Sequence, residues 1–139
     1  MTLKEYVNQE GKTSNGKGRT PLMAAAMNEH FQVVKYLIEQ GEADPNIAHH
    51  STGWNALHYA ASNNGTNIAL IELLLIHMPL DSINKKTARG GATPLDLAIG
   101  LNDSPLRQEI IALLRSKGGI ANKYDENGNH IDDEDEDDY

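Results

Sequence analysis

Histidine is the residue type in this sequence best suited to hold a metal ion or transfer a proton, because the 139 residues include six histidines and no cysteine. His49 and His50 form an adjacent pair. Neighbours on a connecting segment cannot both face one metal ion in the way that two histidines four residues apart on a helix can. We therefore expect this pair to lie in a surface turn, and we predict no metal site.

Two short motifs suggest phosphate or calcium binding, but each lacks a residue that the chemistry needs. The sequence GKT at residues 11–13 ends like a phosphate-binding loop, yet Tyr6 stands where that loop requires its first glycine. Residues 125–136 have acidic or amide side chains at the first, third and fifth positions of a calcium loop. The sixth position of such a loop needs glycine for its sharp turn, and here it is His130. We predict neither site.

Catalytic motifs are also absent from the sequence. No nucleophile, base and orienting group stand together in a recognisable arrangement, and the carboxylates before the C-terminal segment are scattered. We therefore expect a protein that is not an enzyme and that needs no cofactor.

The net charge of −8 lies entirely near the C-terminus. Residues 1–122 carry 11 acidic and 11 basic side chains, whereas residues 123–139 carry Lys123 and nine carboxylates. The body has no basic domain and the C-terminal segment repels phosphate, so direct nucleic-acid binding is not expected. The chain has no apolar segment of signal-peptide or membrane-span length. We expect a cytoplasmic location, with a nuclear or exported protein as open alternatives.

The segments that must position these side chains recur along the chain. Three similar heptapeptides, TPLMAAA, NALHYAA and TPLDLAI, occupy residues 20–26, 55–61 and 93–99. Their first residues are separated by 35 and then 38 positions. A second apolar segment follows each of them, at residues 31–38, 68–76 and 106–114. Self-similarity at this period, with two short helical segments per unit, predicts a stacked repeat.

The repeating unit resembles the ankyrin repeat, whose motif reads T-P-L-H-x-A-A, then a turn, an outer helix and G-A-D-x-N. The resemblance covers about residues 15–122. It implies an all-α ankyrin-repeat solenoid of three helix–turn–helix repeats with β-turn fingers, at about residues 15–50, 51–88 and 89–122. It also implies that His58, in the histidine position of the motif, forms hydrogen bonds within the stack.

The two ends of the chain lie outside these repeats. A capping box at Thr2 and Glu5 predicts an N-terminal capping helix over residues 2–10, followed by a loop, so that residues 1–14 cover the first repeat. Residues 123–139 lose all apolar periodicity and include an unbroken acidic run. We expect them to form a disordered acidic tail.

The ankyrin resemblance also implies where a partner protein would bind. Contacts in that family come from the finger tips, from the residue before each Thr-Pro position and from the end of each inner helix, which together line a concave groove. Carried over residue by residue, these positions are Lys17, Arg19, Met27, Asn28, His50, Trp54, Ser62, Asn63, Lys86, Arg89, Ala92 and Leu101.

Trp54 is the most informative of these positions because it is the only tryptophan and lies beside a turn in the middle repeat. Tryptophan and arginine are enriched among the residues that dominate binding energy. Trp54 either contacts a partner or packs on the neighbouring finger, and the sequence leaves both open. Lysine and arginine side chains precede repeats one and three, so we expect a basic groove margin that either favours an acidic partner surface or is covered by the chain's own acidic tail.

The sequence therefore predicts a noncatalytic protein–protein interaction module that acts as a monomer, without nucleic acid or membrane partners. An alternative is that the acidic tail is itself the ligand, so that the chain inhibits or acts as a decoy for a basic nucleic-acid-binding protein or toxin. Strong salt dependence of binding would favour this alternative.

Overall fold

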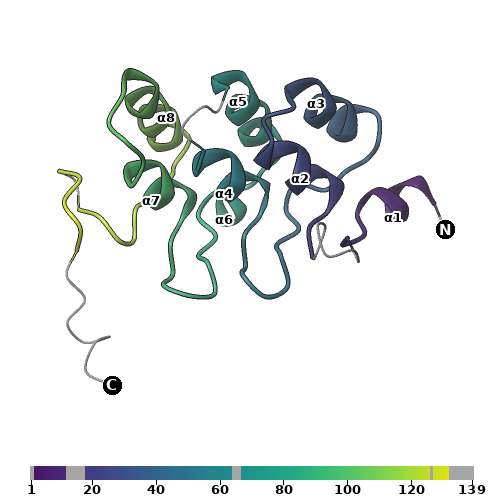
Figure 1. Ribbon diagram of the computed structural model, residues 1–139, viewed down its shortest axis with the longest axis horizontal. Helices are drawn as coiled ribbons and strands as arrows, with labels where there is room; N and C mark the ends of the chain where they lie inside the picture. The colour runs from purple at the N-terminus through teal and green to yellow at the C-terminus, as the bar shows by residue number, and fades with distance from the viewer. Residues whose placement is uncertain (1, 12–17, 64–66, 126, 132–139) are drawn as a thin grey trace.

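The computed structural model describes residues 2–11, 18–63, 67–125 and 127–131. The regular elements of these residues are helices arranged in two rows (Figure 1). An inner row comprises α2 (Pro21–Met27), α4 (Ala56–Ala61) and α7 (Pro94–Ile99). An outer row comprises α3 (Phe31–Glu39), α5 (Ile68–His77) and α8 (Pro105–Ser116). Each inner helix is followed by its outer helix, so the predicted all-α solenoid of three helix pairs is confirmed.

The inner helices begin where the sequence supplies capping residues. The side chains of Thr20, Asn55 and Thr93 each accept a hydrogen bond from a backbone amide in the first turn. Pro21 and Pro94 then occupy a first-turn position that does not need an amide donor. Local capping therefore sets where each repeat starts.

The core lies between the two helix rows and continues from repeat to repeat. The inner helix α4 packs between α2 and α7, and the outer helix α5 packs between α3 and α8. Because α5 has neighbours on both sides, it buries Leu70, Ile71, Leu73, Leu74 and Leu75. This arrangement explains why the sequence of α5 is apolar nearly all round.

The N-terminal helix is shorter than predicted. The capping box of Thr2 and Glu5 is present, but α1 spans only Leu3–Val7. Asn8 follows it, and the Asn8 side chain donates to the carbonyl of Glu42 and accepts from the amide of Asp44 at 2.7 Å. The chain therefore leaves the helix at Asn8 because that side chain is bonded to the next repeat.

The sequence analysis did not predict the short helix α6 (Leu80–Ile83), which lies between α5 and the third repeat. It buries Ile83 and leaves Leu80 57% exposed. Asn84 follows α6 just as Asn8 follows α1. A helix of four residues is too short to give a periodic apolar pattern, so this segment was expected to be part of a connector.

Part of the expected tail is folded against the third repeat. Tyr124 is half-buried against the core and forms an isolated β-bridge with His130. The amide of Ile131 donates to the carbonyl of Lys123 at 2.8 Å. This segment differs from the structureless expectation because Tyr124 packs against the core, with its hydroxyl group beside Gly100. The acidic run at residues 132–138 lies outside the described residues, so its disorder stays a prediction.

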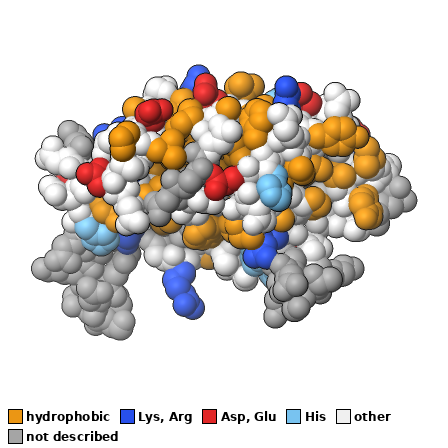
Figure 2. Space-filling view, turned by 45° about the horizontal axis from the view of Figure 1, so that its top comes forward, with side chains coloured by type: hydrophobic (Ala, Val, Ile, Leu, Met, Phe, Trp, Pro, Cys, Tyr) orange, Lys and Arg blue, Asp and Glu red, His pale blue; other side chains and the backbone are white. Residues whose placement is uncertain are grey.

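The outer-helix side of the molecule presents mixed chemistry (Figure 2). Acidic and basic side chains are interspersed there with hydrophobic ones. Ile76 is 73% exposed, whereas Met78 is 5% exposed and belongs to the core, so these two residues do not form a shared contact surface. Within the described residues, no helix is both long enough and apolar enough to span a membrane.

Candidate protein-binding groove

Tight backbone turns, which we call fingers, project beside the inner helices (Figure 1). We define the first, second and third fingers as residues 8–19, 46–54 and 84–92, and residues 12–17 of the first lie outside the described residues. In the second finger the His49 amide donates to Trp54 at 2.7 Å, and in the third the Thr87 amide donates to Ala92 at 2.9 Å. A hydrogen bond of 2.8 Å from the amide of Ala88 to the carbonyl oxygen of Thr52 joins these two fingers.

The buried imidazole of His58 connects the second repeat to the third finger. Its Nε2 atom lies 2.8 Å from the carbonyl oxygen of Lys85 and 3.3 Å from that of Ala92. Its Nδ1 atom accepts the backbone amide of Asn55 at 3.0 Å. Since carbonyl oxygens only accept, Nε2 must hold the proton of the neutral ring. His58 is therefore a structural residue, as the resemblance implied.

Acid is expected to destabilise the fold through His58. Burial lowers its pKa from 6.5 to about 4, so the unfolded chain binds this proton more tightly than the folded chain. The stability that His58 contributes is complete above pH 6.5 and is lost as the pH falls toward 4. Between pH 7 and pH 5 the loss should be about 2 kcal/mol. Urea denaturation of wild type and His58→Gln at both pH values measures this loss. If both proteins lost the same free energy of unfolding between pH 7 and pH 5, the acid sensitivity would not come from His58.

Trp54 packs on the inner helix of its own repeat. Its ring centroid is 5.2 Å from that of Tyr59 and 5.8 Å from that of His58. Both Trp54 and Tyr59 are half-buried, so each keeps part of its surface available. Burial raises the pKa of the Tyr59 hydroxyl, while the nearby charge of Arg19 acts in the opposite direction. Arg19 of the first finger therefore lies close to this aromatic pair.

The first groove cavity, of about 350 Å³, opens between the second and third fingers. Trp54, Ser51 and Thr52 form one wall, and Thr87 and Arg89 form the other. Trp54 thus faces the neighbouring finger across a cavity instead of filling the space between them. The site combines an aromatic surface with a guanidinium group, which are side chains that often dominate protein interfaces.

The second groove cavity, of about 340 Å³, lies at the end of the inner row beside α7. Ser62 of the second repeat and Ala92, Leu97 and Gly100 of the third border it. The remaining wall comes from Asp96 of α7 and from Lys123, Tyr124 and His130, of which the last three were expected to belong to the tail. This part of the groove was therefore not predicted.

The structure brings together some of the predicted contact residues and separates others. Trp54 and Arg89 share the first cavity, and Ser62 and Ala92 share the second. The side-chain amide of Asn63 donates to the backbone carbonyl of Met27 at 3.2 Å, which links the ends of two inner helices. Three further positions line neither cavity: Lys86, Asn28 and Leu101. Lys17 lies outside the described residues.

The adjacent histidines lie at the second finger, near the first. Their rings stack with centroids 4.9 Å apart, and the Nδ1 atom of His50 lies 3.1 Å from a carboxylate oxygen of Glu10. Their ring atoms lie against Gly18, where a side chain would collide with them. No group of three histidine or carboxylate side chains in the described part of the chain is arranged to hold a metal ion. The geometry therefore favours contact between fingers for this pair.

Two residues at the same position of successive inner helices were not predicted: Leu97 borders the second cavity, and Tyr59 packs on Trp54. Each follows the histidine position of the repeat motif by one residue. A helical residue at this position points away from the side that packs on the outer row, and the repeat spacing alone could have identified it.

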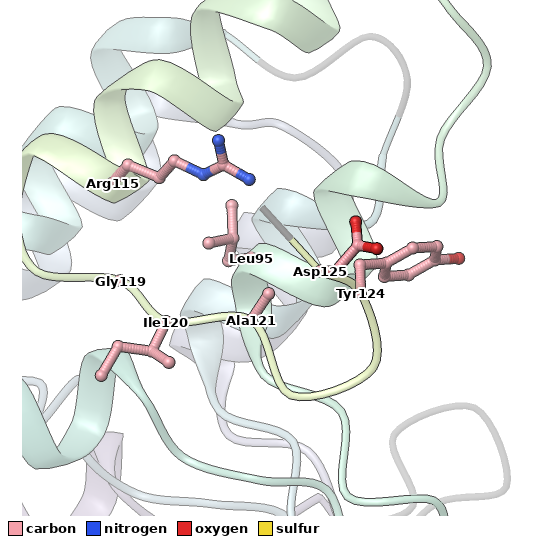
Figure 3. Close-up of a pocket in the computed structure, with 7 residues that line it drawn as sticks. All are labelled: Leu95, Arg115, Gly119, Ile120, Ala121, Tyr124 and Asp125. Carbon is pink, nitrogen blue, oxygen red and sulfur yellow. The ribbon is translucent and has the colours of Figure 1, made fainter. Parts of the chain in front are cut away.

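A further cavity, of about 520 Å³, lies at the C-terminal end of the stack (Figure 3). Leu95, Ile120 and Ala121 form its apolar part. Arg115 reaches over it from α8, while Tyr124 and Asp125 border the opposite side. The segment that carries Tyr124 therefore separates this end cavity from the groove.

A stack of helix pairs with a row of fingers defines a class of repeat protein that offers an extended surface to other macromolecules. The family model described as ankyrin repeats (3 copies) matches residues 2–79 and 44–127. The chain belongs to the ankyrin repeat family. Members of this family generally mediate protein–protein interactions and are typically noncatalytic.

The curated relatives are much longer proteins. The chain is 29% identical over 125 residues to zinc finger CCCH domain-containing protein 47 of Arabidopsis thaliana, a match that covers 87% of this chain and 21% of the relative. It is 34% identical over 109 residues to mouse ankyrin repeat and SAM domain-containing protein 6, which covers 78% of this chain and 11% of the relative. The chain thus spans about a fifth or less of the length of these relatives.

Proposed function

We propose that the chain binds a partner protein through the groove between its fingers and inner helices. The half-buried pair Trp54 and Tyr59 carries this proposal, because it places a large aromatic surface in the middle of the groove. Arg19 lies near the pair on one side and Arg89 borders the adjoining cavity on the other. Aromatic and arginine side chains together form a favourable centre for an interface.

The chemistry of this centre favours a partner surface that carries carboxylates beside an apolar or aromatic side chain. Arginine binds carboxylates through two parallel hydrogen bonds, and the aromatic pair offers an apolar surface next to it. We propose that the chain acts noncatalytically, as a monomer in the cytoplasm, and that its partner is a protein and not a nucleic acid or a membrane.

Trp54→Ala is expected to weaken partner binding about 30-fold, or by ~2 kcal/mol. The reason is that the substitution removes the indole ring that forms one wall of the cavity beside Arg89. Affinity capture from a cell extract, followed by titration of the captured protein against wild type and variant, measures the change.

Tyr36→Ala is the matched control, because Tyr36 is an aromatic residue of the outer helix α3 and is 66% exposed. This variant should bind the captured protein as wild type does. Equal affinity of folded Trp54→Ala and wild type, or an equal loss in Tyr36→Ala, would remove the groove from consideration.

The alternative function, in which the acidic run inhibits a basic protein, has its support in the sequence alone. Residues 132–138 are all acidic, and they lie outside the described residues. Charge reversal within this run would abolish binding under the alternative. Under the groove proposal the captured protein would still bind.

A further inference from the structure

Residues 122–131 have the backbone geometry of another finger. The Asp125 amide donates to Asn129 at 2.9 Å, and the Gly128 amide donates back to Asp125 at 3.0 Å. The second finger closes with a similar pair of bonds around a turn that is one residue longer: the His49 amide donates to the carbonyl oxygen of Trp54, and the Gly53 amide donates to that of His49. In each case the glycine has a positive φ, of 83° at Gly128 and 75° at Gly53. We call residues 122–131 the fourth finger; Glu126 within it is not among the described residues.

An asparagine side chain holds the connector before the fourth finger, and another asparagine holds the connector before the second finger in the same way. Asn84 donates to the carbonyl of Gly118 at 3.0 Å and accepts from the amide of Ile120 at 2.7 Å. Asn8 makes the equivalent pair of bonds to the connector between the first and second repeats. Residues 8, 46, 84 and 122 are all asparagine, at an interval of 38 residues. The segment that begins at Gly118 therefore starts a fourth repeat unit.

The fourth finger is anchored to α7 by a buried side chain. Asp96 is 3% exposed and accepts hydrogen bonds from the amides of Asn122 and Lys123, the latter at 2.7 Å. The same carboxyl group accepts from the amide and the hydroxyl group of Thr93. Asp96 occupies the position that His58 has in the second repeat, so in both repeats this side chain bonds to the finger that follows.

This anchoring places part of the fourth finger against the groove. Tyr124 and His130 pack edge to face with ring centroids 5.2 Å apart. With Lys123 they form one wall of the second groove cavity, opposite Leu97 and Ser62. Tyr124 also contacts the end of α7 near Gly100.

We propose that the fourth finger is part of the partner-binding surface, and that the second cavity receives an apolar or aromatic side chain of a peptide segment rich in carboxylates. This inference rests on the proposed function and adds a second subsite to the one at Trp54. Apolar contact comes from Leu97 and Tyr124, and both cavities have a cationic residue in their walls, Arg89 in the first and Lys123 in the second.

Charge complementarity selects an acidic segment as the occupant. Among the residues that line the two cavities, the carboxylate is that of Asp96, and its oxygens already accept bonds from Thr93, Asn122 and Lys123. An arriving carboxylate would meet Arg89 at the first cavity and Lys123 at the second, where the opposing carboxyl group of Asp96 is already bonded to these donors.

The experiment uses a phage-displayed library of random peptides selected on the full-length chain. We expect the selected peptides to contain an aromatic or large apolar residue close to several acidic residues. The best peptide is then made with a fluorescent label and titrated by anisotropy against wild type, Trp54→Ala, Tyr124→Ala and His130→Ala. Arg115→Ala is the matched control, because Arg115 lies with Tyr124 at the end cavity but does not line the groove cavity.

Tyr124→Ala and His130→Ala should each weaken peptide binding, the first about tenfold, while Arg115→Ala binds as wild type does. Tyr124→Phe, which keeps the ring, should also bind as wild type does. If only Trp54→Ala weakens binding, the fourth finger is not part of the surface and this inference fails while the groove proposal stands. If no groove variant changes the affinity, the proposed function fails. Selection of peptides without acidic residues would overturn the ligand chemistry.

Discussion

Replacing His58 by alanine should lower the free energy of unfolding by about 3 to 4 kcal/mol. The imidazole is fully buried, so its loss leaves a cavity at the centre of the stack. It also leaves the carbonyl of Lys85 and the amide of Asn55 without the bonds that His58 now makes. Small domains are stable by only about 5 to 15 kcal/mol, so this change removes a large share of the total. Equilibrium urea denaturation at pH 7 measures it.

A matched substitution separates this effect from the general loss of a histidine. His77 is exposed at the end of α5, and His77→Ala should change stability by less than about 0.5 kcal/mol. The loss of stability in His58→Gln should lie between those of His58→Ala and His77→Ala, because a side-chain amide can both accept from Asn55 and donate to Lys85. A wild-type denaturation midpoint for His58→Ala would show that the buried ring does not connect the repeats.

Asp96→Ala should cost about 3 kcal/mol and should also release the fourth finger from the third repeat. The substitution removes the acceptor for the buried amide of Thr93 and for the part-buried amides of Asn122 and Lys123. Two of these belong to the segment after α8, so its position depends directly on this carboxyl group. Hydrogen exchange at the amides of residues 122–131, together with urea denaturation, measures both effects.

Asp103→Ala serves as the control for Asp96→Ala. Asp103 forms a contact of 3.2 Å with Arg107, but its side chain is 87% exposed. Exposed ion pairs contribute little, so this variant should keep both the stability and the exchange pattern of wild type. Slow exchange at Asn122 and Lys123 in Asp96→Ala would mean that other contacts hold the finger, and the proposed anchoring would then be wrong.

Most of the fold could be predicted from the sequence because its determinants are local. The capping residues Thr20, Asn55 and Thr93 mark where inner helices begin, and the apolar periodicity after them marks the outer helices. The short helix α6 and the early end of α1 were missed, since each covers barely one turn and depends on contacts with another repeat.

The groove was predicted less completely. Trp54 and Arg89 were expected to contribute to it, and they border one cavity. Tyr59 was overlooked although it packs against Trp54, and Tyr124 was assigned to a tail without structure. A residue that follows the last recognisable helix carries no local signal that it will fold back onto the groove.

The sequence by itself determined that three helix pairs form a stack, because capping and apolar spacing act between residues close in the chain. The fingers beside the inner row were implied by the ankyrin resemblance. Only the tertiary structure decided which side chains share a cavity. Trp54 meets Arg89, and Tyr124 meets Ser62, across 35 or more residues of sequence, so their meeting depends on how successive repeats pack. It also decided that Asp96 holds a fourth finger, since a buried carboxyl group is positioned by the repeat around it and its partners lie 26 and 27 residues further along the chain.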